Sequence, residues 1–300
     1  MASLLRLRAP AKLNLYLRVL GRRPDGYHEI ETVFERIDLA DELTFELHPS
    51  EVRLTCSDSS LSCGEDNLIL QAARLLEREA GVSAGARLHL EKRIPVSAGL
   101  GGGSSDAAAA LLGLNRLWDL GLDRDRLIEL AARLGSDVPF FLSPEPFAAG
   151  RGRGERCEPL GVSARLAHVL VVPPERLSTK EVYAGAHFNL TARTPSITIV
   201  THALRNGPAM AGLADGLWND LEPEAILRCP VIATIQAHLR EQGCLGVLVS
   251  GSGSSVFGLC ADGTQAHEAA ARIRGFAPGE WRVEIVHTEH PSRIVTPALP

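Results

Sequence analysis

The chain has 300 residues, 45% of them hydrophobic and 22% charged, which is enough apolar material for one large domain or two ordinary ones. Its formal net charge of −5 excludes a general attraction to nucleic acids or anionic membranes, so any anion site must be built locally. The six cysteines are dispersed without zinc-site spacing. The first residues lack the apolar core of a signal peptide, and no apolar run reaches the roughly 18–20 residues of a membrane span. We therefore expect a cytoplasmic protein with reduced, mostly buried cysteines.

The chain opens with a β pattern. Apolar and polar side chains alternate over residues 12–19, which predicts a strand with one buried face. A turn follows at Pro24-Asp25-Gly26, and residues 33–47 continue in a β-like pattern that is interrupted near Asp41.

Helices alternate with strands in the next segment. Residues 66–80 carry an apolar stripe, with Asp66 as a possible cap and Gly81 at the end, so they predict a helix. Residues 86–94 alternate like a strand, and a further helix is predicted over residues 124–134, ending at Gly135.

The pattern changes near Gly150–Gly154, a glycine- and arginine-rich stretch that we interpret as a flexible boundary. We therefore expect two domains, residues 1–158 and 159–300. The second half mixes helices with strands that must pack on one sheet face, which predicts an α+β class. Its predicted strands are near 166–172, 245–249, 256–260 and 281–288, and its predicted helices are near 179–186, 196–206, 220–243 (broken at Pro230) and 264–274.

The most informative segment is the glycine-rich run from Pro95 to Asp106, which leads directly into four alanines. Glycines admit a ligand close to the backbone, and a helix that starts there offers free N–H groups to an anion. The run contains no lysine and so is not a P-loop, and it lacks the GxGxxG spacing of a dinucleotide fold. We predict a phosphate site rather than a linker, with Ser104 or Ser105 either capping the helix or binding phosphate or a phosphate-held Mg²⁺.

Two other residues stand out. Lys12 is one of three lysines, with Lys92 and Lys180, and shares a strand face with Asn14. The strand pattern alone predicts a solvent-exposed lysine at this position. Asp137 lies in a turn between Gly135 and Pro139, where it is either a turn cap or a general base.

Five segments together resemble the GHMP kinases, and the resemblance runs in order over nearly the whole chain. The longer glycine loop resembles the branch that phosphorylates a cytidine diphosphate-linked methylerythritol. The segments are Pro10–Leu15, Gly21–Glu29, Pro95–Asp106, Gly135–Phe141 and Ser250–Phe257.

This resemblance implies an ATP- and Mg²⁺-dependent kinase that phosphorylates the 2-hydroxyl of that substrate in the non-mevalonate route to isoprenoid precursors. It implies an α+β fold of two domains, an N-terminal one like ribosomal protein S5 domain 2 and a ferredoxin-like C-terminal one, with the active site in the cleft between them. It implies no protein, nucleic-acid or membrane partner.

The resemblance also implies roles for individual residues. Lys12 and Asp137 are the expected catalytic residues; Asp137 takes the hydroxyl proton or orients the hydroxyl. Asn14, Tyr27, His28 and Tyr183 are expected to bind substrate, with Tyr27 stacked on cytosine and His28 bonded to it. ATP is expected to contact Pro95, Val96, Ser97, Ala98, Gly99, Leu100, Gly101, Gly102, Gly103, Ser104 and Ser105, the last also being the candidate Mg²⁺ ligand.

Three alternatives compete with this prediction. A GHMP kinase acting on homoserine, mevalonate or a sugar needs no base-stacking residues, so Tyr27 and His28 argue against it. An inactive nucleotide-binding regulator would not need Lys12 and Asp137. An RNA-binding protein of the S5 type is disfavoured by the net charge of −5.

Overall fold

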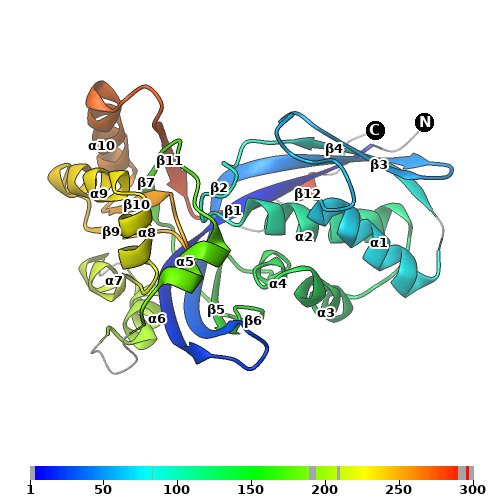
Figure 1. Ribbon diagram of the computed structural model, residues 1–300, viewed down its shortest axis with the longest axis horizontal. Helices are drawn as coiled ribbons and strands as arrows, with labels where there is room; N and C mark the ends of the chain where they lie inside the picture. Colours follow the sequence, from blue (N-terminus) through cyan, green and yellow to red (C-terminus); the bar gives the residue numbers. More distant parts are fainter. Residues whose placement is uncertain (1–3, 83, 189–193, 208–209, 290–294, 297–300) are drawn as a thin grey trace.

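The structure is a computed structural model that describes the chain except residues 1–3, 83, 189–193, 208–209, 290–294 and 297–300. The described residues form a two-domain α+β fold around two sheets, shown in Figure 1. The first half of the chain contains β1 (Leu5–Arg22), β2 (His28–His48), β3 (Val52–Cys56), α1 (Leu68–Ala80), β4 (Gly85–Glu91), α2 (Gly102–Leu117), α3 (Arg124–Leu134), α4 (Val138–Phe141), β5 (Phe147–Gly152) and β6 (Arg156–Pro159).

The second half supplies the other elements. They are β7 (Ala167–Val172), α5 (Thr179–Gly185), α6 (Ile197–Asn206), α7 (Met210–Gly216), β8 (Trp218–Asn219), α8 (Glu222–Arg228), α9 (Val231–Glu241), β9 (Gly246–Val249), β10 (Val256–Cys260), α10 (Gly263–Phe276), β11 (Arg282–His287) and β12 (Val295–Thr296).

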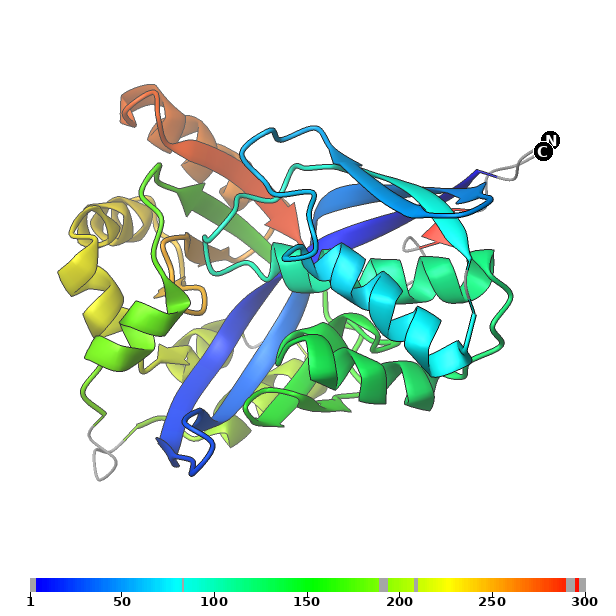
Figure 2. The same cartoon turned by 45° about the vertical axis from the view of Figure 1, so that its right-hand side comes forward.

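The first sheet has the strand order β12-β1-β2-β4-β3, with β8 paired to β1 and the hairpin β5–β6 paired to β2. The second sheet has the order β11-β7-β10-β9 and is antiparallel throughout. Helices α1 to α4 lie on one face of the first sheet, and the long β1–β2 pair extends from it past the second domain (Figures 1 and 2). Because β1 and β2 reach both domains, a residue on β1 can face the space between them.

Strand β1 corrects the expectation of a single buried face. Its apolar side chains Leu13 and Leu15 pack in a core with Leu170 and Phe257 of the second domain. On its opposite face, Lys12 is only 4% exposed. Both faces are covered because the glycine loop lies across the side that the sequence pattern predicts to be solvated.

The helix boundaries refine two other expectations. Helix α1 ends at Gly81 as predicted, but Asn67 rather than Asp66 caps its start by accepting the amide of Ile69. Helix α2 begins within the glycine run, with Gly101 at the cap position and no side-chain cap, so neither Ser104 nor Ser105 is the cap. A glycine with φ 68° turns the chain into the helix without needing a serine there.

The stretch from Gly150 to Gly154 is not a flexible linker. Gly150 and Gly152 belong to β5 and pair with Thr32 and Ile30 of β2. A Cβ on Gly150 would approach Phe34 and Thr32 to 2.8 Å, so this glycine serves close strand packing rather than mobility.

The remaining expectations for the second half are confirmed. The helix pair α8 and α9 is divided at Cys229 and Pro230, and β9 pairs with β10 in a hairpin. All six cysteines are free thiols, but only Cys229, Cys244 and Cys260 are buried, so burial holds for half of them. Among the described residues, none of the helices has the length and apolarity that crossing a membrane requires.

Candidate active site

A cleft of about 1510 Å³ lies between the glycine loop, the β1–β2 pair and helix α5. Every residue that the sequence predicts for the site lines this cleft except Ser105. Tertiary structure therefore brings together predicted residues that are as much as 171 positions apart, from Lys12 to Tyr183.

The glycine loop is packed between two other segments. The carbonyl of Leu100 accepts a hydrogen bond from the amide of Lys12, at 2.9 Å. At Gly99, with φ 78°, an added Cβ would lie 2.0 Å from the carbonyl oxygen of Ser250. At Gly101, it would lie 3.0 Å from Cγ of Lys12. These glycines are required for close approach, and the loop leads into the N-terminus of α2, where amides without helical partners are available to an anion.

We expect Gly99→Ala to abolish most activity and to destabilise the fold. The new methyl group would meet the Ser250 carbonyl, and alanine at positive φ costs a further ~1–2 kcal/mol. Gly81→Ala is the matched control, because Gly81 has φ 63° but open space around its Cβ position. Thermal unfolding and turnover should separate the two: both variants lose stability through backbone strain, and only Gly99→Ala loses turnover. Equal turnover in the two variants would contradict this role for the loop.

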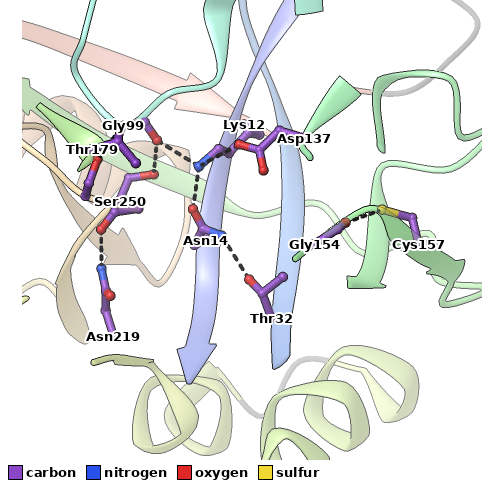
Figure 3. Close-up of polar contacts among 12 residues, drawn as sticks. Lys12, Asn14, Thr32, Gly99, Asp137, Gly154, Cys157, Thr179, Asn219 and Ser250 are labelled. Atoms are coloured by element: carbon purple, nitrogen blue, oxygen red, sulfur yellow. Dashed lines mark hydrogen bonds and ion pairs between the residues drawn. The ribbon is translucent and has the colours of Figure 1, made fainter. Parts of the chain in front are cut away.

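Lys12 and Asp137 meet on the floor of the cleft (Figure 3). The Lys12 ammonium donates to the side-chain oxygen of Asn14 and to the carbonyl of Gly99 at 2.9 Å, and lies 3.8 Å from Oδ2 of Asp137. Asn14 is oriented in turn by its amide, which donates to Thr32. Asp137 stands at the cap position of α4 but makes no capping hydrogen bond, so its carboxylate is directed toward Lys12 and the cleft.

The environment of Lys12 affects its charge. Burial lowers the pKa of the Lys12 ammonium, and the Asp137 carboxylate opposes that effect. An ammonium held by three acceptors in a poorly hydrated site exerts a stronger field on a bound anion than a surface lysine does.

Aromatic side chains form the other end of the cleft. The His28 ring stacks on Tyr183, with centroids 5.1 Å apart, and meets Phe188 edge to face at 5.3 Å. Burial and the nearby Arg22 lower the pKa of His28, which keeps its imidazole neutral near pH 7. Tyr27 is 53% exposed and carries the Arg153 guanidinium 4.7 Å above its ring. This end of the cleft therefore offers flat apolar faces and a neutral donor–acceptor ring.

Three charged residues at the start of α2 form a buried cluster that the sequence does not reveal. The Lys92 ammonium bridges the carboxylates of Asp41 and Asp106, with 3.0 Å to Asp106. Asp41 also accepts the amides of Arg93 and Ile94, which fixes the entry to the glycine loop. The only sequence signal is the break in the β pattern near Asp41.

Ser105 lies differently from the expectation. It is 1% exposed, and its hydroxyl has no hydrogen-bond partner. Oδ1 of Asp106 is also buried and without a partner, while its other oxygen contacts Lys92. Two oxygens without hydrogen-bond partners therefore belong to consecutive residues near the start of α2.

Comparison with known proteins agrees with this geometry. The family model "GHMP kinases N terminal domain" matches residues 67–145, and "GHMP kinases C terminal" matches residues 201–279. The chain is 47% identical over 267 residues to 4-diphosphocytidyl-2-C-methyl-D-erythritol kinase from Pelotomaculum thermopropionicum, covering 89% of this chain and 92% of that protein. It is 42% identical over 270 residues to the enzyme of the same name from Enterococcus faecalis, covering 90% and 94%.

A solved structure gives the same result. The crystal structure of a 4-(cytidine 5′-diphospho)-2C-methyl-D-erythritol kinase superimposes with a TM-score of 0.79 at 38% identity, covering 95% of this chain and all of that one. The N-terminal match contains the glycine loop and Asp137, the C-terminal match contains Gly251 and Ser252, and the relatives span about nine tenths of the chain. The chain belongs to the GHMP kinase family.

Proposed function

We propose that this chain transfers the γ-phosphate of ATP to the 2-hydroxyl of 4-diphosphocytidyl-2-C-methyl-D-erythritol. The observation that carries the proposal is the Lys12–Asp137 pair, which lies between the glycine loop and the aromatic end of one cleft. The relatives that share 38–47% identity carry the name of this kinase, and the reaction belongs to the non-mevalonate route to isoprenoid precursors.

On the nucleotide side, the glycine loop supplies backbone amides and contains no cation of its own. Loops of this kind bind the triphosphate through N–H groups and the helix N-terminus. Lys12 supplies the positive charge from β1, because its side chain packs against Gly101 and reaches the carbonyl of Gly99. The triphosphate is thus placed with its terminal phosphate toward Lys12.

At the reacting centre, Asp137 acts on the substrate hydroxyl and Lys12 acts on the transferring phosphoryl group. The Asp137 carboxylate accepts a hydrogen bond from the substrate hydroxyl, orients it toward the γ-phosphorus, and receives its proton as the new O–P bond forms. The O–P bond to ADP breaks in the same step, and the Lys12 ammonium offsets the charge on the transferring group. Asn14 keeps the ammonium in place through its bond to Nζ.

On the acceptor side, the aromatic residues read the cytosine. Tyr27 offers an exposed ring for stacking, and His28 a neutral imidazole for the edge of the base. Tyr183 and Phe188 fix the His28 ring by stacking and edge contact. Homoserine and mevalonate carry no base, so this wall favours the cytidine-linked acceptor over them.

We also propose that Mg²⁺ enters with the nucleotide. Among the described residues, no group of three or more histidine, cysteine or carboxylate side chains is arranged to hold a metal. Mg²⁺ in kinases needs few protein ligands because phosphates and water complete its shell. Asp106 fits this requirement better than Ser105, because Asp106 lines the cleft near the start of α2 and its Oδ1 has no hydrogen-bond partner, whereas Ser105 does not line the cleft. When bound, the ion would neutralise charge on the phosphates.

Asp106 gives the fold a testable pH dependence. Burial raises the pKa of Asp106 to about 8, against the opposing effect of Lys92. An unfolded aspartate titrates near pH ~3.9, so the folded chain holds an extra proton between these values. The free energy of unfolding contributed by this group therefore falls as the pH rises from about 4 to about 8.

We expect Asp106→Asn to remove this component. Thermal unfolding from pH 5 to pH 9 should show a smaller decline in the variant than in the wild type. Asp25→Asn is the control, because the pKa of the exposed Asp25 carboxyl is lowered rather than raised. Parallel curves for wild type and Asp106→Asn would contradict the raised pKa of the buried Asp106.

The experiment that tests the function follows ADP release from purified protein with ATP and Mg²⁺. The acceptor is offered in turn as 4-diphosphocytidyl-2-C-methyl-D-erythritol, homoserine and mevalonate. We expect turnover with the first alone. Turnover with homoserine or mevalonate only would reassign the substrate within the family, and none with any acceptor would remove the kinase proposal.

For the fold, we propose the finer assignment of a ribosomal S5 domain 2-like N-terminal domain and a ferredoxin-like C-terminal domain, divided near residue 158. The four-stranded antiparallel sheet covered by α9 and α10 supports the second part. Strands β8 and β12 come from the second half of the chain yet pair with β1, so the division is one of packing and not of strict sequence order.

A further inference from the structure

Asn219 on the two-residue strand β8 makes a set of buried contacts behind the proposed reacting centre. Its side chain is buried, and its amide nitrogen donates to the carbonyls of Val249 at 2.8 Å and Gly251 at 2.7 Å. Its side-chain oxygen accepts the amide of Leu221 at 2.9 Å. One amide group thus satisfies the last carbonyl of β9 and a carbonyl of the loop that follows it.

That loop, residues 250–253, packs against the side chain of Lys12. A Cβ on Gly251 would lie 3.1 Å from Nζ of Lys12 and 3.2 Å from the side-chain oxygen of Asn14. The Ser250 hydroxyl donates to the carbonyl of Gly99, which is also the carbonyl that accepts Lys12 Nζ. Figure 3 shows the contacts of Ser250 and Lys12 with Gly99, together with Asn219, which is bonded to the residues on either side of Ser250.

The residues beside Asn219 fix it relative to β1. The Asp220 carboxylate accepts the amide of Val19 at 2.7 Å, and the Asp220 amide donates to Leu17. The Glu222 carboxylate accepts the amide of Val249 at 2.9 Å. Residues 219–222 are therefore bonded both to the strand that carries Lys12 and to the loop that packs against Lys12.

We propose that Asn219 is a positioning residue for phosphoryl transfer: its amide holds loop 250–253 against Lys12, and the loop holds the ammonium at the reacting centre. The proposal rests on the proposed kinase function. Without the amide, two buried carbonyls lose their donor and the loop must move to find others. A misplacement of about 1 Å at a reacting group can cost about a hundredfold in rate. Lys12 binds the transferring group, whereas the glycine loop amides bind the nucleotide, so kcat should fall more than ATP affinity.

The test compares three variants in steady-state kinetics and thermal unfolding. Asn219→Ala removes the amide, and Asn219→Asp keeps its shape but offers no N–H to either carbonyl. Asn115→Ala is the matched control, because Asn115 also bonds one backbone segment through both ends of its amide, at Leu122, far along α2 from the cleft. We expect both Asn219 variants to lose about tenfold to a hundredfold in kcat with little change in the KM for ATP, and Asn115→Ala to lose stability alone.

Asn219→Asp separates a donor role from simple space filling. If it keeps the wild-type kcat, or if both Asn219 variants only lower the unfolding temperature as Asn115→Ala does, the proposal is overturned. A rise in both KM values with unchanged kcat overturns it as well. If Asn219→Ala does not fold, Asn219→Asp and Asn219→Ser, which retains one donor and should be intermediate, decide the question. Wild-type turnover is measured first on each acceptor. A wild-type protein that is inactive on all of them defeats the proposed kinase function. If one acceptor is used, the ratio of variant to wild-type kcat on that acceptor tests the positioning role of Asn219.

Discussion

Asp137→Asn should lower kcat by about 10²–10⁴-fold while leaving the affinity for ATP nearly unchanged. The asparagine keeps the size of the side chain at the start of α4 but cannot take a proton from the substrate hydroxyl. The proposed nucleotide site is the glycine loop, so we expect nucleotide binding not to depend on this carboxylate.

Steady-state kinetics and direct titration of a nucleotide analogue measure the two effects separately. Asp123→Asn is the control: Asp123 caps α3 by accepting the amide of Arg126, and asparagine caps a helix equally well. Equal losses in kcat and in ATP affinity for Asp137→Asn would remove its catalytic assignment and make it part of the nucleotide site.

Lys12→Met should lower kcat by about 10²–10³-fold and change the unfolding temperature little, because the removed cost of burying an ammonium offsets the lost hydrogen bonds to Asn14 and Gly99. Methionine fills the same buried channel, so packing is kept, and the cost of burying an ammonium disappears. Lys12→Arg should be no more active than Lys12→Met. Gly101 packs so closely on the lysine stem that even a Cβ there would lie 3.0 Å from Lys12 Cγ, so the larger guanidinium does not fit.

The pH profile gives a second readout for Lys12. Burial lowers its pKa, so the ammonium is lost and kcat declines at a pH below the ordinary lysine range. The Lys12→Met profile should lack that alkaline decline.

The double variant of Lys12→Met with Asp137→Asn should have a kcat little lower than that of either single variant, because the two groups act on the same proton and phosphate. Additive losses would show that they act independently.

Local sequence signals account for much of the fold. Gly81, Gly135 and Pro230 end or divide helices where the pattern predicts, because each acts through its own backbone geometry. The pattern fails at Gly150, where a glycine that reads as a hinge is a strand residue pressed against Phe34. Glycine is used for mobility and for close packing alike, and only the neighbour across the sheet distinguishes the two.

For the site, the order of motifs in the sequence predicted the glycine loop, Lys12, Asp137 and the aromatic residues, and all of them line one cleft except Ser105 of the loop. It did not reveal Lys92 with its two carboxylates, nor Phe188, because single charged or aromatic residues carry no spacing signal. It placed Lys12 on a solvated strand face, and the structure buries that face under the loop.

The sequence by itself predicted an anion site, because a lysine-free glycine loop before an alanine helix needs only local backbone geometry to form one. The ordered motifs that resemble those of the GHMP kinases predicted the class of chemistry. Only the tertiary structure decided which residues complete that site. Lys12 meets Asp137 through an ion pair. Asn219 meets the loop over Lys12 through a side-chain hydrogen bond, and β8 pairs with β1 across about two hundred positions. Contacts of that separation depend on how the two domains pack, which no local pattern encodes.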